Sequence, residues 1–217
     1  MTYEIMKPEE WKECIELAAR AFGNYDFFSV YFPKRQKRLR FLSNMLRVEF
    51  TVNKDLVHFL TAKENGKIVA VALLRDPRYQ MPSVKEYLRA GFWRNLVIGG
   101  WKNVTAWFDM DQKAGIPCQE LKGDVWYLHL LAVDISHEGM GVGSRMLREC
   151  LIPYVKKHGG KAFSLYTNSE INRKFYTKNG FKEFHAQEFS YNGKSFGSWS
   201  YIMDMTDSRV KLQTDLH

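Results

Sequence analysis

The chain has 217 residues, of which 45% are hydrophobic and 15% aromatic, and it carries a net charge of +8. The apolar fraction is near the globular average, which excludes a mainly disordered chain. Three cysteines, Cys14, Cys118 and Cys150, form no disulfide framework, and the six scattered histidines give no zinc pattern. The length suits one large domain or one domain with an insertion. The positive charge suits an anionic partner, or serves only solubility.

Neither an export signal nor a membrane span is expected. The first residues, Met1–Ile5, lack a basic segment followed by an apolar one. No apolar run approaches the about 18 residues that a membrane-spanning helix needs. No nucleic-acid recognition motif accompanies the positive charge. We therefore expect a cytoplasmic protein whose partners include neither a membrane nor a nucleic acid.

Hydrophobic periodicity predicts a strand and two helices at the start of the chain. The strand covers Tyr3–Met6, the first helix runs from Pro8 to Gly23, and the second follows Pro33. Aromatic residues dominate the connecting segment Tyr25–Phe32. These aromatics either line a cleft or only pack against the helices.

A hairpin and then an irregular segment follow. The hairpin strands are expected over Val57–Ala62 and Ile68–Leu74, with Asn65-Gly66 as the turn signal. Residues 75–124 contain helical stretches but no clear strand, so we expect a helical insertion there. The segment holds three tryptophans, Trp93, Trp101 and Trp107.

The regular pattern resumes after the insertion. The predicted elements are, in order, a buried strand over Val125–Val133, an amphipathic helix over Gly141–His158, a strand over Lys161–Thr167, a helix over Ile171–Asn179, and strands over Phe181–Phe189 and Ser198–Met205. The polar end, Thr206–His217, is expected to be a loose tail. The whole chain is then a single domain.

A glycine-rich turn lies between the buried strand and the amphipathic helix. Gly139, Gly141 and Gly143 alternate along it, so the backbone can approach a ligand without obstruction by Cβ atoms. The helix behind the turn offers unpaired N–H groups and a positive dipole end, which favour a pyrophosphate. No Gly-Lys-Ser/Thr follows, and the spacing differs from GxGxxG. The glycines alone therefore leave two interpretations: a phosphate cradle, or a plain tight turn into a helix.

Two motifs together resemble the GNAT superfamily of N-acetyltransferases. The first is the strand Leu130–Asp134 followed by Glu138–Gly143, which resembles that family's acetyl-CoA motif. The second is Asn172–Tyr176 with Gly180–Phe181, where Asn172 and Tyr176 share one helix face. Among the branches of the family, the puromycin-acetyltransferase-like one shares the Thr…Asn…Phe-Tyr arrangement seen at Thr167, Asn172, Phe175 and Tyr176. The resemblance spans about Tyr127–Phe181, and the remaining pattern is compatible with it.

The resemblance implies an α/β (α+β) acyl-CoA N-acyltransferase fold. Its central sheet is mixed and mostly antiparallel, helices flank it, and the helical insertion falls between the third and fourth strands. It implies acetyl-CoA as cofactor, bound by Leu131, Ala132, Val133, Glu138, Gly139, Met140, Gly141, Val142, Gly143, Ser144, Asn172 and Tyr176. A strand N–H near Leu131–Val133 is implied as the oxyanion donor. Two positions depart from the family pattern. Glu138 replaces the usual Gln or Arg, and Tyr166 stands where the puromycin branch has Glu.

The resemblance also implies a general acid, whereas the base has to be sought among the residues. Tyr176 is the acid, or else a core residue with a solvated hydroxyl. His129 is the candidate base, because imidazole is a common proton acceptor, although a lone His in an apolar strand is more often structural. His58, Asp109 and Asp111 are weaker candidates. For the acceptor we expect contacts from Tyr25, Phe28, Tyr31 and Trp107, covered by the insertion. The acidic residues Asp109, Asp111, Glu120 and Asp124 either hold a cationic acceptor or are surface charges.

The predicted function is an acetyl-CoA-dependent N-acetyltransferase. It would move an acetyl group to the primary amine of a small molecule by direct transfer in a ternary complex. Two alternatives remain: a protein or peptide N-acetyltransferase of the same fold, and a non-catalytic acyl-CoA-binding regulatory domain. No metal is expected, and a monomer and a homodimer are both compatible with the sequence. Arg145 and Arg173 are the nearest cations for the phosphates of coenzyme A.

Overall fold

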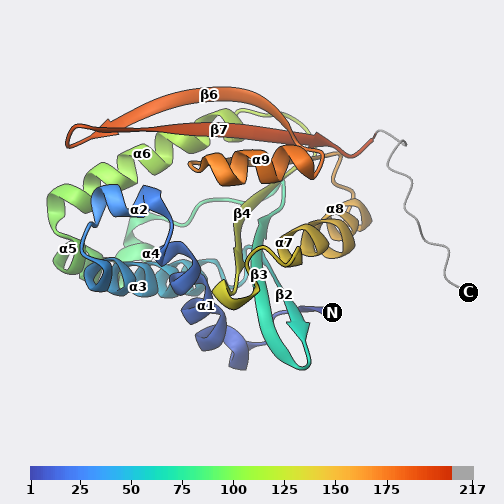
Figure 1. The fold of residues 1–217 in the computed structure, drawn as a ribbon, viewed down its shortest axis with the longest axis horizontal. Helices are drawn as coiled ribbons and strands as arrows, with labels where there is room; N and C mark the ends of the chain where they lie inside the picture. Colours follow the sequence, from blue (N-terminus) through green and yellow to red (C-terminus); the bar gives the residue numbers. More distant parts are fainter. Residues whose placement is uncertain (207–217) are drawn as a thin grey trace, which may run out of the picture.

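The computed structural model describes residues 1–206, so the predicted tail from residue 207 onward lies outside the described residues. The strands form one seven-stranded sheet in the order β1-β2-β3-β4-β5-β7-β6 (Figure 1). Their bounds are β1 Thr2–Ile5, β2 His58–Glu64, β3 Lys67–Arg75, β4 Val125–Val133, β5 Ala162–Thr167, β6 Lys182–Tyr191 and β7 Lys194–Asp204. Every neighbouring pair is antiparallel except β4 and β5. The predicted mixed, mostly antiparallel sheet is confirmed.

Helices cover both faces of this sheet. Their bounds are α1 Trp11–Gly23, α2 Asp26–Tyr31, α3 Arg35–Asn53, α4 Val84–Arg89, α5 Trp93–Gly99, α6 Trp101–Gln119, α7 Val142–Arg145, α8 Ile152–Lys157 and α9 Glu170–Lys178, with short η1 Pro8–Glu10 and η2 Ile135–His137. The elements α4, α5 and α6 form the helical insertion between β3 and β4, as predicted (Figure 1). The helix α6 is longer than its apolar pattern indicated, because it continues through Pro117.

Two hydrophobic cores lie on opposite faces of the sheet. Strand β3 contributes to both, with Val71 and Leu73 in one core and Ala70 and Ala72 in the other. The first core contains residues of α1, α2, α3 and α6, and the second contains residues of α7, α8 and α9. A strand that is buried on both faces has a nearly continuous apolar sequence. This explains why polar and apolar residues do not alternate along β3.

A β-bulge interrupts strand β4 at His129. Leu73 pairs with Leu130, but the next residue, Leu74, pairs with Leu128, so His129 is the extra residue. The bulge also turns the strand over: Leu128 faces one core and Leu130 the other. Bulges re-aim side chains and are common beside active sites.

The parallel contact between β4 and β5 is short. It consists of three residue pairs and ends at Tyr127 and Ser164, although both strands continue beyond that point. Past this point the two strands are no longer paired, which leaves a gap in the sheet next to Leu131 and Val133. We call this region the β4–β5 gap.

The helix after the glycine turn is continuous from Val142 to Lys157, close to the predicted Gly141–His158. Its middle, Met146–Leu151, is a π-helical segment (η3) between α7 and α8. Pro153 lies directly after this π-helical segment, in the interior of the continuous helix. Such π segments are frequent at functional sites.

Candidate active site

The glycine turn has the backbone geometry that a phosphate cradle requires. Gly139 and Gly141 have φ values of +76° and +77°, and Gly141 is the N-cap of α7. A Cβ at either residue would meet no atom within 4 Å, so open space faces both. The first N–H groups of the helix have no acceptor within it. The turn therefore fits the pyrophosphate of coenzyme A through backbone donors and the helix dipole.

The start of α7 is packed against α9 and the end of β4. A Cβ on Gly143 would lie 3.2 Å from the Phe175 ring and 3.5 Å from Val133 Cγ2. Ser144 Oγ accepts a hydrogen bond from Asn179 Nδ2 at 3.0 Å. The two predicted motifs thus meet at one end of the β4–β5 gap, and the close approach of the two helices favours glycine at 143.

The arginines near this turn are paired with carboxylates. Arg145 Nη2 lies 3.8 Å from Glu64 Oε1, and Arg173 Nε donates to Glu183 Oε2 at 2.8 Å. Glu138 and Met140 within the turn are exposed. The backbone N–H groups at the start of α7 are therefore donors that need no change in these ion pairs.

Polar groups gather around the Tyr25 phenol at the end of β5. Its oxygen lies 3.0 Å from Thr167 Oγ1 and accepts a hydrogen bond from the Asn168 N–H at 3.0 Å. Burial raises the pKa of Tyr25, and nearby Asn172 and Ser169 act in the opposite direction. Among the residues predicted to contact the acceptor, Tyr25 is thus the one that lies beside Asn172 of the second motif.

Tyr176 is buried, with 8% of its surface exposed. Its ring packs against Phe175, Phe181 and Tyr201. Burial, and secondarily the Tyr25 phenol, raises the pKa of Tyr176 above its ordinary range. The phenol therefore keeps its proton at neutral pH, as a general acid must.

His129 lies in an ionic cluster that the sequence did not reveal. Its Nε2 is 2.9 Å from Glu49 Oε1 on α3 and 3.3 Å from Arg75 Nη2. Glu49 also pairs with Arg75 at 3.0 Å and accepts hydrogen bonds from Tyr87 and Asn53. His129 and Arg75, acting against burial, lower the pKa of Glu49 to about 2. Glu49 thus places a carboxylate directly beside the imidazole of His129.

Asp111, on α6 of the insertion, belongs to the same neighbourhood. Its Oδ1 accepts a hydrogen bond from the Tyr166 hydroxyl at 2.5 Å. Burial raises the pKa of Asp111, and the hydrogen bond from Tyr166 and the nearby charge of Arg75 partly oppose that effect. Tyr166 thus binds a carboxylate supplied by the insertion.

The other predicted acceptor residues lie in aromatic packing. Phe28, Tyr31 and Trp107 are each at most 7% exposed. Phe28 packs near Trp107, and Tyr31 stacks on Tyr191 with ring centroids 4.7 Å apart. Contact between these three side chains and an acceptor would require them to move.

The weaker candidates for the base and for a cation site are spread over the molecule. His58 Nδ1 lies 3.0 Å from the Tyr154 hydroxyl, beside Trp126, away from the ionic cluster. Asp109 and Asp124 pair with Lys113 and Lys161 near the surface. Glu120 is exposed. Of the four acidic residues considered for a cationic acceptor, Asp111 is the one near His129.

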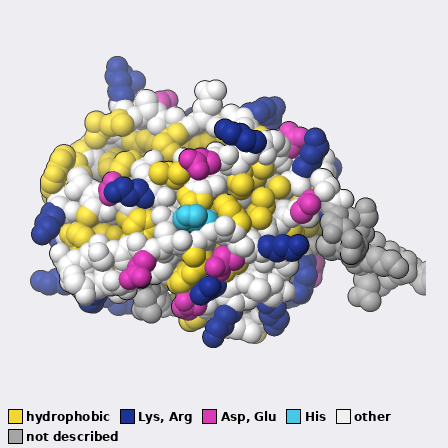
Figure 2. All heavy atoms as spheres, turned by 90° about the horizontal axis from the view of Figure 1, so that it is seen from above, with side chains coloured by type: hydrophobic (Ala, Val, Ile, Leu, Met, Phe, Trp, Pro, Cys, Tyr) yellow, Lys and Arg dark blue, Asp and Glu magenta, His cyan; other side chains and the backbone are white. Residues whose placement is uncertain are grey.

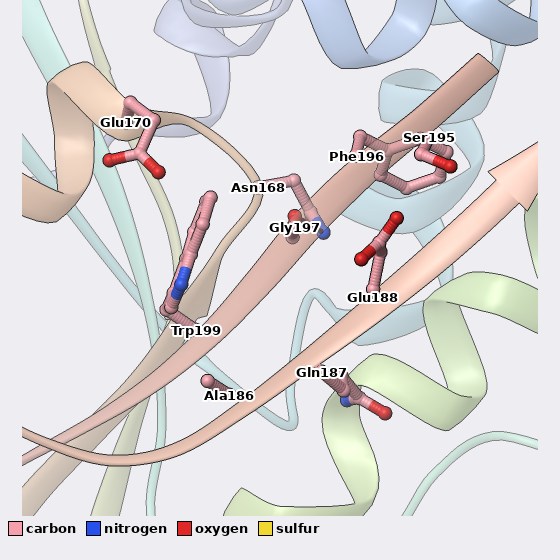
Figure 3. Close-up of a pocket in the computed structure, with 9 residues that line it drawn as sticks. All are labelled: Asn168, Glu170, Ala186, Gln187, Glu188, Ser195, Phe196, Gly197 and Trp199. Atoms are coloured by element: carbon pink, nitrogen blue, oxygen red, sulfur yellow. Dashed lines mark hydrogen bonds between the residues drawn. The ribbon is translucent and has the colours of Figure 1, made fainter.

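A hollow of about 680 Å³ opens at the start of α9, beside β6 and β7. Figure 3 shows Glu170 on one side of it and Glu188 on the other, with Asn168 and Gly197 between them and Trp199 below Glu170. Asn168 connects the hollow to Tyr25 through its backbone N–H. The hollow therefore offers an approach to the end of β5.

Within residues 1–206, no group of three or more His, Cys, Asp or Glu side chains is arranged to hold a metal ion. No helix in the same range is long and apolar enough to span a bilayer.

The comparisons with known proteins agree with this geometry. The sequence profile described as the acetyltransferase (GNAT) family matches residues 11–181. No curated protein sequence matches the chain significantly. The chain belongs to the GNAT acetyltransferase family, and it is therefore an N-acetyltransferase enzyme.

Solved structures share this fold at low sequence identity. The histone acetyltransferase HPA2 and related acetyltransferase from Corynebacterium glutamicum has a TM-score of 0.60 at 18% identity, with 92% of this chain and 94% of that chain covered. The ribosomal-protein-S18-alanine N-acetyltransferase from Escherichia coli has a TM-score of 0.54 at 14% identity, with 97% of each chain covered. A protein named for a proposed phosphinothricin N-acetyltransferase activity has a TM-score of 0.54 at 13% identity, with 95% and 99% covered. At such identities the likeness shows the fold alone.

Substitution of Gly141 by Ala should weaken acetyl-CoA binding at least about tenfold. The new Cβ would occupy the open space of the cradle and force a left-handed backbone on Ala, which costs roughly 1–2 kcal/mol. Isothermal titration with acetyl-CoA measures the effect. Gly193→Ala is the matched control, because Gly193 has φ +75° and open space but lies in the β6–β7 turn. Equal affinities of the two variants would contradict the cradle.

Glu49 should make folding stability depend on acidic pH. Its pKa is about 2 in the folded state, below the ordinary value of 4.5, so its contribution is complete above about pH 5 and is lost as pH falls. Between pH 7 and pH 3, wild type should lose roughly 2 kcal/mol more unfolding free energy than Glu49→Gln. Urea unfolding at pH 7, 5 and 3 measures this difference. The exposed control Glu120→Gln should follow wild type, and the prediction fails if Glu49→Gln does so too.

Proposed function

We propose that the protein transfers the acetyl group of acetyl-CoA to the primary amine of a small molecule, directly within a ternary complex. The observation that supports this most is the ionic cluster of Glu49, Arg75 and His129, which comes from α3, the end of β3 and the bulge in β4, beside the β4–β5 gap. Asp111 of the insertion interacts electrostatically with this cluster. Because the insertion covers this side of the sheet, a compact acceptor fits better than an extended polypeptide (Figure 1).

In this proposal, the cofactor half of the site uses mainly backbone groups. The residues that would hold acetyl-CoA are Leu131, Ala132, Val133, Glu138, Gly139, Met140, Gly141, Val142, Gly143, Ser144, Asn172 and Tyr176. When bound, acetyl-CoA supplies the thioester that is to be attacked. An unpaired N–H of β4 near Leu131–Val133 is suited to stabilise the oxyanion, because β5 no longer pairs with the strand there.

In the acceptor half of the site, side chains remove protons from the amine and deliver one to the leaving thiolate. Two protons must leave the acceptor nitrogen as the N–C bond forms and the C–S bond breaks. His129 accepts the first, with Glu49 stabilising the charge it acquires. The second ends on sulfur, where Tyr176 donates its phenolic proton and then recovers one.

The finer family assignment rests on four residues. Thr167, Asn172, Phe175 and Tyr176 follow the puromycin-acetyltransferase-like arrangement. Thr167 lies 3.0 Å from the Tyr25 phenol, and Asn172 lies near that phenol as well. This clustering supports membership of that branch.

A protein N-terminus or lysine is the second candidate acceptor. The observation in its favour is the hollow beside β6 and β7, which could admit an extended chain. A thiol-release assay with acetyl-CoA, run against a panel of small primary amines and a panel of peptides, separates the two. Turnover of peptides alone would contradict the proposed small-molecule function.

Tyr176→Phe should lower kcat roughly a hundredfold or more, because the proton donor is removed but the ring packing remains. Steady-state thiol release measures kcat, and isothermal titration checks that the variant still binds acetyl-CoA. Tyr201→Phe is the control, since Tyr201 is a buried neighbour whose hydroxyl bonds Glu183. If both variants keep wild-type kcat, Tyr176 is not the acid.

His129→Gln should lower kcat/KM for the amine about a hundredfold, since a neutral amide cannot take up the proton. The acetyl-CoA affinity should not change. His58→Gln, on the opposite core near Trp126, should retain wild-type rates. Comparable kcat/KM values for the two variants would exclude His129 as the base.

A further inference from the structure

Three large apolar side chains are exposed where α5 meets α6. Val97 is 77% exposed, Trp101 is 68% exposed and Trp93 is 52% exposed. Trp93 and Val97 lie four residues apart, on one face of α5. Gly100, with φ +85°, then turns the chain directly into α6, which begins at Trp101. The three side chains therefore come from adjoining turns of two consecutive helices.

Phe108 continues this surface along α6. It is exposed and lies seven residues after Trp101, so the two side chains share one face of the helix. The Phe108 ring also lies 6.4 Å from the Phe92 ring at the start of α5, centroid to centroid. We call Trp93, Val97, Trp101 and Phe108 the insertion patch. Single exposed apolar residues are ordinary, but a cluster on neighbouring helices indicates contact with another molecule.

The chain segments around the insertion patch are basic and contain no carboxylate. Neither residues 87–108 nor residues 27–48 include an Asp or a Glu. The cations of these two segments are Lys34, Arg35, Lys37, Arg38, Arg40, Arg47, Arg89, Arg94 and Lys102. The positive charge of the protein is therefore concentrated in α3 and in the part of the insertion that carries the patch.

Cations of both segments lie beside the patch. A Cβ on Gly100, between α5 and α6, would be 3.9 Å from Lys37 Nζ of α3. Arg94 lies over the Trp93 ring, with its Cζ 5.4 Å from the ring centroid. In other parts of the molecule, several cations are paired with carboxylates of neighbouring elements. The insertion patch thus combines exposed apolar side chains with a positive border.

This surface lies at one end of the molecule. Figure 1 shows α5, the start of α6 and the start of α3 together at that end, with the glycine turn before α7 on the far side of β3 and β4. In Figure 2 the same end is at the left, where hydrophobic side chains reach the surface and Lys and Arg side chains lie at the edge. A partner bound at this end would leave the glycine turn accessible.

An anionic lipid surface matches this composition better than other partners do. Tryptophan and basic residues together favour the boundary between head groups and acyl chains, because the apolar side chains leave water while the cations reach phosphate. A second copy of the chain, related by a two-fold axis, would place one basic surface against another, which is repulsive. A nucleic acid would bind the cations but would offer no apolar phase to Val97.

We propose that the insertion patch docks the protein on an anionic lipid surface. Trp93, Val97 and Trp101 enter the head-group region, and Lys37 and Arg94 bind lipid phosphates. The expectation that no membrane is a partner rested on the lack of a spanning segment, and a peripheral contact needs no such segment. The inference is independent of the acceptor that the enzyme uses.

Co-sedimentation of the whole protein with lipid vesicles tests the proposal. One set of vesicles contains equal parts of phosphatidylglycerol and phosphatidylcholine, and the other contains phosphatidylcholine alone. Wild type should bind the anionic vesicles at least about tenfold more tightly, and added salt should weaken this binding because it screens exposed charges. Equal binding to both sets, or no binding to the anionic set, would overturn the proposal.

A charge variant tests the basic border. Lys37→Gln combined with Lys102→Gln should weaken binding to the anionic vesicles roughly thirtyfold, since each cation near such a surface contributes about fivefold. Lys157→Gln combined with Lys182→Gln is the matched control, because it removes the same charge from α8 and the start of β6, toward the other end of the molecule (Figure 1). The control should bind as wild type does. Equal weakening of the two would show attraction to net charge alone and would contradict the docking surface.

An apolar variant tests the exposed side chains without changing the charge. Val97→Gln combined with Trp101→Gln should weaken binding to the anionic vesicles at least about tenfold. Ile5→Gln combined with Leu56→Gln is the control, since both residues are exposed but Ile5 lies on β1 and Leu56 just before β2. The control should keep wild-type binding, and circular dichroism checks that every variant is folded.

Two further results would assign the patch to another partner and overturn the proposal. Polyglutamate or duplex DNA might compete with the vesicles equally in wild type and in the Val97→Gln, Trp101→Gln variant, which would identify a site for any polyanion. Sedimentation equilibrium could instead find a dimer that this variant abolishes while vesicle binding stays, which would identify a second copy. Thiol release from acetyl-CoA is measured separately, so either result leaves the acetyltransferase function standing.

Discussion

The short contact between β4 and β5 is the constraint on which the rest of the site depends. Two parallel strands that stay paired along their full length would leave no unpaired backbone in the middle of the sheet. Here pairing stops at Tyr127 and Ser164, and the bulge at His129 turns β4 immediately afterwards. The end of the strand pairing and the change in direction of the His129 side chain therefore occur within two residues of each other on β4. The glycine turn ends at one side of this gap and the ionic cluster lies at the other.

The two sides of the gap use different kinds of interaction. The turn before α7 relies on backbone N–H groups and a helix dipole, which do not change when a side chain such as Glu138 departs from the family pattern. Glu49, Arg75, His129 and Asp111 lie on the opposite side and interact electrostatically with one another. In the proposed function, cofactor binding is therefore tolerant of sequence change, whereas the choice of acceptor is sensitive to it.

The local hydrophobic pattern of the sequence was sufficient to predict most of the strands and helices. The strand Val125–Val133 was predicted with the observed bounds, because a continuous apolar run bordered by polar residues has few interpretations. The bulge at His129 could not be predicted from that run. A bulge shifts the alternation of polar and apolar residues, and this mostly apolar strand has no such alternation. The helical pattern around Glu49 likewise gave no sign that the insertion would pack near this residue and bury it. Asp111 had a usable signal: it shares one face of α6 with Trp107, Ala114 and Cys118, which are buried. Among the acidic residues considered, that spacing distinguishes it from Asp109.

The insertion connects two strands, β3 and β4, that are antiparallel neighbours in the sheet. A short hairpin would join them equally well. Lengthening a flexible connection from a few residues to the span from 76 to 124 corresponds to about four doublings, or roughly 2.5 kcal/mol of closure entropy. The packing of α4, α5 and α6 offsets a term of this size easily. The helices of the insertion are thus a module that evolution or an engineer can exchange at this one junction. The sheet, its gap and the glycine turn would stay as they are, and the same acetylating machinery could be retargeted to another amine.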